Sequence, residues 1–156
     1  MVGTVDARLT DLGIEIATPA APVANYVGFV TTGNLVFVSG QLPLKEGKLQ
    51  YEGRLGESVS LEEGQAAARL CAVNIIAQLK AACDGDLDRV KRIVRLGGFV
   101  NSVPGYKDQP KVINGASDLM AEVFAEAGTH CRAAVSAGAL PLDAAVEIDA
   151  IAEITQ

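Results

Sequence analysis

The sequence lacks several residue types on which common kinds of binding site depend. It has no tryptophan, and aromatic residues make up only 4% of the chain, so stacking platforms for single-stranded nucleic acid are not expected. Basic residues are also scarce: 13 Lys and Arg face 19 Asp and Glu, for a formal net charge of -6. Because contacts to phosphate dominate nucleic-acid affinity, we expect no nucleic-acid partner.

Residues that bind metals are few. The only histidine is His130, and the three cysteines, Cys71, Cys83 and Cys131, form no CxxC pair. This set is too small for a zinc site, so we expect no metal. An odd number of cysteines at unrelated spacings indicates free buried thiols in a reducing compartment, which predicts a cytoplasmic protein.

Long hydrophobic runs are absent as well. No apolar stretch approaches the roughly 20 residues that a membrane-spanning helix requires, and the first residues lack the pattern of a signal peptide. We therefore expect no membrane association. The chain has 156 residues, of which 49% are hydrophobic, which suits one domain over residues 1–156 with a peripheral N-terminal arm over residues 1–22.

Two strands and a helix are predicted in the first half of the domain. NYVGFV and LVFVSGQLPL flank the turn signal TTGN and predict a β-hairpin, and the polar, glycine-punctuated residues 45–58 predict a loop. Ser60 and Glu63 form a capping-box pattern at the start of a helix that ends near Gly85. Its apolar stripe consists of Ala68, Cys71, Ile75, Leu79 and Ala82.

The second half predicts a strand over residues 88–102, a helix over residues 111–129 and two closing strands. The helix has an apolar stripe of Val112, Ala116, Leu119 and Val123. The closing strands, CRAAVSAGAL and AAVEIDAIAEI, are predicted to pair as a hairpin across the turn PLD. The predicted order is β-β-α-β-α-β-β, an α+β fold with one mixed sheet and two helices on one of its faces.

The other face of this sheet needs a partner. Arg132, Ala134 and Ser136 alternate with Ala133 and Val135, so small or apolar residues occur on both faces of their strand. A sheet with two such faces is not expected to leave one of them in water. We infer that the uncovered face packs against other copies of the chain.

Three segments together resemble one family. VFVSGQLPL, a central FVN and the closing CRAAVSAGALPLDAAVEIDAIAEI are similar, in order and separation, to motifs of the RidA/YjgF/UK114 family, also called endoribonuclease L-PSP-like. The resemblance covers roughly residues 23–154. It implies a chorismate-mutase-like fold and a homotrimer with a central barrel and active sites between subunits. It also implies hydrolysis of reactive enamines and imines, such as 2-aminoacrylate, to 2-keto acids and ammonia.

The same resemblance implies roles for individual residues. The arginine that grips the substrate carboxylate falls on Arg132, and the glutamate that positions water falls on Glu147. The serine and glycine of the first motif fall on Ser39 and Gly40, and the tyrosine of the first strand falls on Tyr26.

A further implied binding residue is Asn114, from the second helix. The chain also departs from the usual family pattern: HCR replaces a common PAR, and Ala134 occupies a substrate-site position that is often a cysteine. These departures, and longer segments at the N-terminus and over residues 101–114, predict a divergent subgroup.

The chemistry of these residues fits a small 2-imino or 2-keto acid. A guanidinium matches a carboxylate with a planar fork of donors, and an imine carbon is already electrophilic, so no cofactor is needed. Structural roles remain open: Arg132 could pair with Glu147 or Asp149, Glu147 could face water, Ser39 could close a strand, and His130 is expected at the surface or at a helix end. The alternatives to an imine deaminase are a binding or regulatory protein for carboxylate metabolites and, less favoured, an endoribonuclease.

Overall fold

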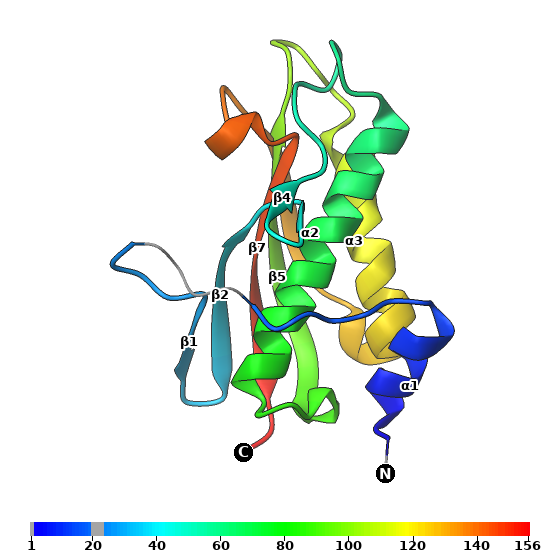
Figure 1. Cartoon of the computed structure of the whole chain (residues 1–156), viewed down its shortest axis with the longest axis vertical. Helices are drawn as coiled ribbons and strands as arrows, with labels where there is room; N and C mark the ends of the chain where they lie inside the picture. Colours follow the sequence, from blue (N-terminus) through cyan, green and yellow to red (C-terminus); the bar gives the residue numbers. More distant parts are fainter. Residues whose placement is uncertain (1, 20–23) are drawn as a thin grey trace.

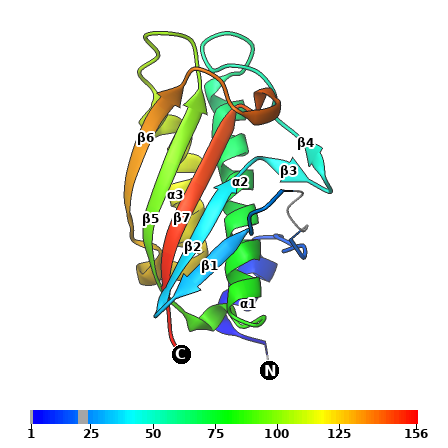
Figure 2. The same cartoon turned by 90° about the vertical axis from the view of Figure 1, so that its left-hand side faces the viewer.

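One five-stranded mixed sheet organises the chain. The structure is a computed structural model that describes residues 2–19 and 24–156. In the order in which they lie side by side, the strands are β1 (Phe29–Thr32), β2 (Leu35–Gln41), β7 (Val146–Ile154), β5 (Val90–Asn101) and β6 (Cys131–Ala137). All neighbouring pairs are antiparallel except β5 and β6, which are parallel. Figure 2 shows this order from the side of the sheet that no helix covers.

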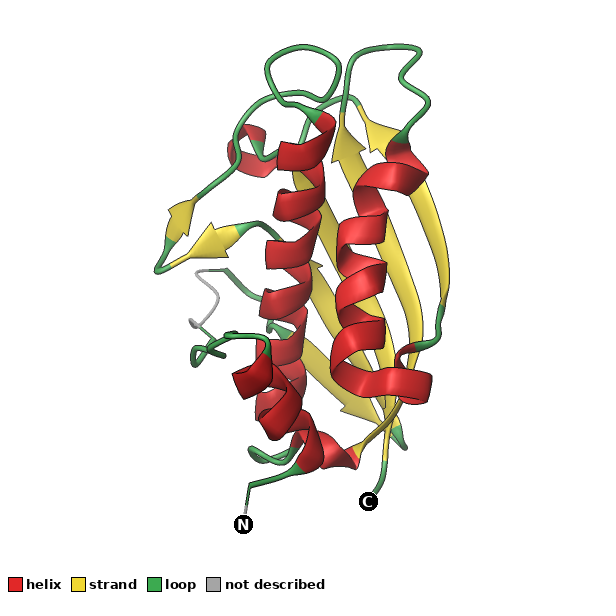
Figure 3. Ribbon diagram, turned by 90° about the vertical axis from the view of Figure 1, so that its right-hand side faces the viewer, coloured by secondary structure: helices red, strands yellow, loops and turns green. Residues whose placement is uncertain are grey.

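Two long helices cover the other face of the sheet, as the sequence predicts. They are α2 (Leu61–Ala82) and α3 (Gln109–Phe124), which lie side by side in Figures 1 and 3. The capping box is confirmed: the Glu63 amide donates to the Ser60 hydroxyl, and the Ser60 amide donates to the Glu63 carboxylate. Both predicted apolar stripes are buried, although Ala82 at the end of the first is only partly covered.

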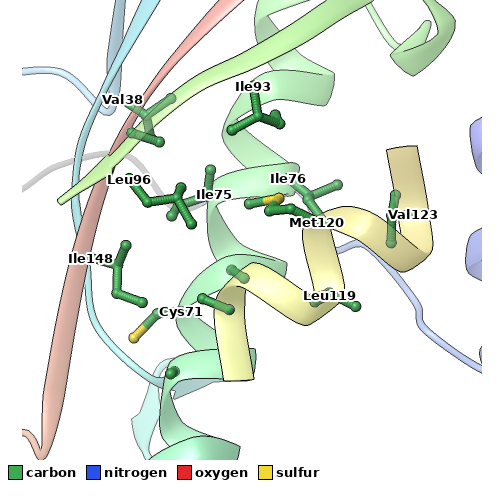
Figure 4. Close-up of a cluster of buried hydrophobic side chains, with 14 of the residues drawn as sticks. Val38, Cys71, Ile75, Ile76, Ile93, Leu96, Leu119, Met120, Val123 and Ile148 are labelled. Atoms are coloured by element: carbon green, nitrogen blue, oxygen red, sulfur yellow. The ribbon is translucent and has the colours of Figure 1, made fainter. Parts of the chain in front are cut away.

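The core lies between these helices and the sheet. Figure 4 shows Ile75, Ile76 and Met120 of the helices meeting Leu96 and Ile148 of the strands. All five side chains are fully buried. Burial alternates along β7, where Val146, Ile148, Ala150, Ala152 and Ile154 face the helices. The intervening residues, Glu147 among them, point to the open face of the sheet.

The predicted hairpin of the last two strands is wrong. Strand β5 lies between β6 and β7, so the two closing strands are not paired. Since α3 connects β5 to β6, these strands form a parallel β-α-β unit. The connection over residues 138–145 is longer than a tight hairpin turn, and it allows the chain to step over β5. It is anchored by Asn101, whose side-chain amide donates to Ala144 O and to the Asp143 carboxylate.

The N-terminal arm is more structured than the sequence suggests. It contains a helix, α1 (Thr4–Asp11), that buries Val5 and Leu9 in the core. The Asp88 carboxylate accepts hydrogen bonds from the amides of Thr4 and Val5 and so fixes the N-terminus of this helix against the domain. Residues 14–19 then run across α2 (Figure 1). Residues 1 and 20–22 of the predicted arm lie outside the described residues.

Smaller differences concern the first half of the domain. The predicted loop over residues 45–58 overlaps a short hairpin of β3 (Leu44–Lys45) and β4 (Lys48–Leu49). Strand β1 begins at Phe29, so Tyr26 precedes it rather than lying within it. The described residues also contain short 3-10 helices of three or four residues, namely η1 (Leu87–Arg89), η2 (Ala125–Gly128) and η3 (Pro141–Asp143).

The open face of the sheet exposes apolar side chains. Val30, Phe37 and Val135 are 55%, 41% and 47% exposed, and the half-buried Phe99 and Ile151 share this face with them. An uncovered apolar patch of this kind is typical of surfaces that bind another protein. Within the part of the chain that the structure describes, no helix has the length and hydrophobicity needed to cross a membrane.

The capping box gives a test of the fold. Ser60→Ala removes the acceptor for the Glu63 amide, and we expect it to cost about 1 kcal/mol of stability. For a domain of this size, the melting temperature should fall by roughly 2–4 °C. Ser60→Asp retains a capping oxygen and is expected to melt close to the wild type. Equal melting temperatures for Ser60→Ala and the wild type would contradict a contribution of the cap.

Candidate functional site

Arg132 lies on the edge strand β6 with its guanidinium against helix α3. Its Nη1 donates to Ser117 Oγ at 3.1 Å, and its Nη2 donates to the carbonyl oxygen of Pro110 at 3.2 Å. The side chain is half-buried, and it forms none of the ion pairs among the described residues. The interpretation of Arg132 as a structural arginine paired with Glu147 or Asp149 is therefore wrong. Asp149 instead pairs with Arg95, at 3.5 Å.

His130 takes part in the same network, which the sequence did not suggest. Its Nε2 lies 2.8 Å from Ser117 Oγ, and its Nδ1 lies 2.6 Å from the carbonyl oxygen of Gly128. It is half-buried and follows η2 with its ring against the last carbonyl of that helix, so the expectation of a surface or helix-end histidine is confirmed as a helix-end position. His130 and Arg132 are two positions apart on an extended segment, a spacing that brings side chains to one face and that could have signalled their association.

Two further predicted binding residues belong to this edge. Asn114 is exposed and lies four residues after Pro110 and three before Ser117, which places it on the face of α3 that contacts Arg132. Ala134 follows Arg132 on the same face of β6 and is packed against the core. Arg132, Asn114 and Ala134 thus lie along the edge of the domain that β6 forms with α3.

Three other predicted residues line a separate cleft of about 370 Å³. They are Tyr26, Ser39 and Gly40, and the facing wall consists of Asn74 and Gln78 of α2 together with residues 17–19 of the arm. Tyr26 is 60% exposed, whereas the Ser39 hydroxyl donates to the carbonyl oxygen of Val27 at 2.7 Å. The hydroxyl thus has a structural contact, and its predicted binding role stays a prediction. The contribution of α2 to this cleft was not predicted, because Gln78 lies next to Leu79, within the span of the predicted apolar stripe.

Glu147 lies against Gly40, on the open face of the sheet. A Cβ at position 40 would come within 2.6 Å of Glu147 Oε1, so glycine is required there for the carboxylate to lie against the β2 backbone. Glu147 is half-buried, and burial raises the pKa of its carboxyl, with a smaller contribution from the negative charge of Asp149. Among the described residues, no cation near Glu147 outweighs the effect of burial on its pKa.

The predicted residues therefore form two groups rather than one. Arg132 is on β6, at one edge of the sheet, and β1 forms the opposite edge, roughly 19 Å away at the usual strand spacing. Arg132 faces the helices, whereas Glu147 faces away from them, and β5 lies between their strands. The predicted hairpin of the last two strands would have placed Arg132 and Glu147 on neighbouring strands, and the observed strand order does not. Within one chain, Arg132 and Glu147 do not share a pocket.

The three cysteines differ in their exposure to solvent. Cys71 and Cys83 are buried in the core, as predicted, whereas Cys131 is exposed. Burial raises the pKa of the Cys71 thiol well above its ordinary value, and the nearby Glu147 charge adds to this shift. Within residues 2–19 and 24–156, no cluster of three or more His, Cys, Asp or Glu side chains is arranged to hold a metal ion.

Comparisons with known proteins agree with this fold. A family model described as "YjgF/chorismate_mutase-like, putative endoribonuclease" matches residues 6–154. The chain belongs to the YjgF family. It is also 50% identical over 153 residues to Protein TCP17 of Trypanosoma cruzi. The match covers 97% of this chain and 95% of TCP17.

Two solved structures are similar over almost the whole chain. Atu1372 from Agrobacterium tumefaciens, a protein of unknown function, has a TM-score of 0.91 and 51% identity, covering 97% of this chain and 92% of its own. A Shewanella oneidensis protein described as a "putative endoribonuclease" has a TM-score of 0.93 and 41% identity, and the match covers 97% of this chain and 100% of the Shewanella chain. The resemblance inferred from the motifs is thereby confirmed at the level of the family.

Thiol reactivity tests the burial of the cysteines. The thiolate is the reactive form, and both burial and a raised pKa suppress it at Cys71 and Cys83. We expect the native Cys131→Ser variant to react negligibly with an aromatic disulfide reagent at neutral pH, and to release two equivalents of chromophore once unfolded. Rapid reaction of the native variant would contradict the packing described here.

Proposed function

We propose that this protein hydrolyses reactive enamines and 2-imino acids to 2-keto acids and ammonia. Arg132 binds the substrate carboxylate, and Glu147 positions the attacking water. The observation that carries the proposal is the state of Arg132: it is half-exposed, held in place by α3, and not neutralised by a carboxylate of the described chain. A fixed, uncompensated guanidinium at an accessible edge is suited to bind a small carboxylate.

The local contacts leave Arg132 able to bind such a ligand. A guanidinium has five N–H donors, and Ser117 and Pro110 accept from two of them. The remaining donors can form the paired hydrogen bonds that a carboxylate accepts. Ala134 on the same face of β6 is uncharged and therefore does not compete with a ligand for the guanidinium.

Glu147 supplies the second chemical requirement. Water adds to the C2 carbon of the imine while the carboxylate accepts one of its protons and passes it to the imine nitrogen, which gives a carbinolamine. Transfer of the remaining hydroxyl proton to nitrogen through the same carboxylate then breaks the C–N bond and releases the 2-keto acid and ammonia. The proton-accepting form is the carboxylate, whereas burial in the single chain favours the neutral acid. A guanidinium brought opposite Glu147 would favour the ionised form.

The geometry of the two groups supports a site between copies of the chain. Since Arg132 and Glu147 lie on opposite faces of the sheet, a common pocket requires Arg132 from one copy and Glu147 from another. The exposed Val30, Phe37 and Val135 on the open face supply apolar surface for such an assembly. A homotrimer is the assembly that the family resemblance implies.

Two other functions are distinguished by experiment. A metabolite-binding protein would use the same Arg132 to bind 2-keto acids saturably but would not accelerate hydrolysis of any imine. Endoribonuclease activity has the support of the family description. The net charge of -6 and the scarcity of aromatic residues count against it. RNA cleavage that persists through repurification and disappears in Arg132→Ala would favour that function.

The proposal predicts the behaviour of Arg132 variants. The 2-imino acids would be generated from a panel of amino acids by an amino-acid oxidase, and the remaining imine trapped with semicarbazide. Arg132→Ala should lower kcat/KM for imine loss roughly a hundredfold or more, because it removes charge-assisted hydrogen bonds to the carboxylate. Arg132→Lys retains the charge but loses the planar fork, and we expect an intermediate rate.

Arg69→Ala is the matched control. Arg69 of α2 forms an exposed ion pair with Glu122 at 3.4 Å and belongs to neither group of site residues, and such pairs contribute little to stability. Its activity should equal that of the wild type. Full activity of a folded Arg132→Ala variant would reject the proposed function.

A further inference from the structure

Arg132 lies at the end of a series of hydrogen bonds in which the donor and the acceptor of each bond can be assigned. A carbonyl oxygen only accepts hydrogen bonds, so the 2.6 Å contact to Gly128 places the imidazole hydrogen on His130 Nδ1. In the neutral ring, Nε2 is then an acceptor, and the Ser117 hydroxyl 2.8 Å away donates to it. The lone pairs of Ser117 Oγ are thereby left to accept from Arg132 Nη1.

Close packing fixes the start of this series of hydrogen bonds, which is the carbonyl group of Gly128. A Cβ at Gly128 would lie 2.1 Å from the carbonyl oxygen of Met120, so only glycine allows η2 to approach α3 this closely. The carbonyl that orients His130 is therefore tied to the same helix that supplies Ser117. Together with the Pro110 contact on Nη2, the network fixes two different nitrogens of the guanidinium and hence its plane.

We propose that Ser117 and His130 are positioning residues that orient the Arg132 guanidinium for the substrate carboxylate. This inference rests on the proposed function, because it assigns Arg132 as the carboxylate-binding group. A guanidinium free to rotate would lose orientational freedom on binding, whereas one held in place binds without that cost. The two residues thus act on substrate affinity rather than on the chemical step.

Ser117→Ala removes the link between Arg132 and His130. We expect it to raise KM for 2-imino acids about tenfold, the effect of one hydrogen bond to a charged group, while kcat changes less than about twofold. Calorimetric titration with pyruvate should show a similar loss of affinity. Glu122→Gln, on an exposed position of the same helix, is the control and should retain the wild-type KM.

A pair of substitutions at His130 separates positioning from packing. His130→Gln retains an acceptor for the Ser117 hydroxyl and should keep KM close to the wild type. His130→Leu fills a similar volume without an acceptor and should raise KM as Ser117→Ala does. Thermal unfolding of both variants reports whether the fold is intact, and this pair decides the question even if Ser117→Ala does not fold.

The double variant provides the sharpest outcome. Both residues act on Arg132 through the same series of hydrogen bonds. Ser117→Ala combined with His130→Leu should therefore raise KM no more than either substitution alone. Multiplying effects, or folded single variants with unchanged KM, would overturn the positioning role. If the wild type neither hydrolyses imines nor binds pyruvate, the proposed function itself fails and this inference with it. An inactive Arg132→Ala beside a fully normal His130→Leu would reject the inference alone.

Discussion

The contact between helix α3 and the guanidinium of Arg132 is the interaction on which the rest of the site depends. The β5–α3–β6 unit places an arginine on an edge strand and a helix directly beside it. The hydrogen bonds to Ser117 and Pro110 hold the charged group in place but leave it without a counter-ion among the described residues. Such an arrangement suits an arginine that meets a negatively charged ligand, because any paired carboxylate would compete with that ligand.

The sheet order determines what this arginine can meet. Strand β7 carries Glu147 on the face turned away from the helices, two strands from β6, so a single copy holds the cation and the acid apart. The same face exposes the apolar side chains of Phe37 and Val135, and their exposure to water is energetically unfavourable. The assembly that we propose would both bury that face against another copy and complete the site. Membership of the YjgF family fixes the fold of each copy, whereas the reaction remains our proposal.

Much of the fold could be predicted where local physics decides it. The capping box at Ser60 and the apolar stripe of α3 depend on spacing within one helix, and both are confirmed. Strand pairing depends on the whole chain, and the closing hairpin was wrong because nothing local reveals that β5 separates β6 from β7. The role of His130 was missed for a related reason: its partner Ser117 is 13 residues away on another element.

Complementation between inactive variants tests the central claim most directly, namely that one site takes Arg132 and Glu147 from different copies. Arg132→Ala and Glu147→Gln would be co-expressed in equal amounts, and mixed assemblies confirmed by native mass spectrometry. Random mixing in a cyclic assembly gives intact sites at about one interface in four, so roughly a quarter of wild-type imine hydrolysis should return. Mixed assemblies as inactive as either parent would contradict a site shared between copies.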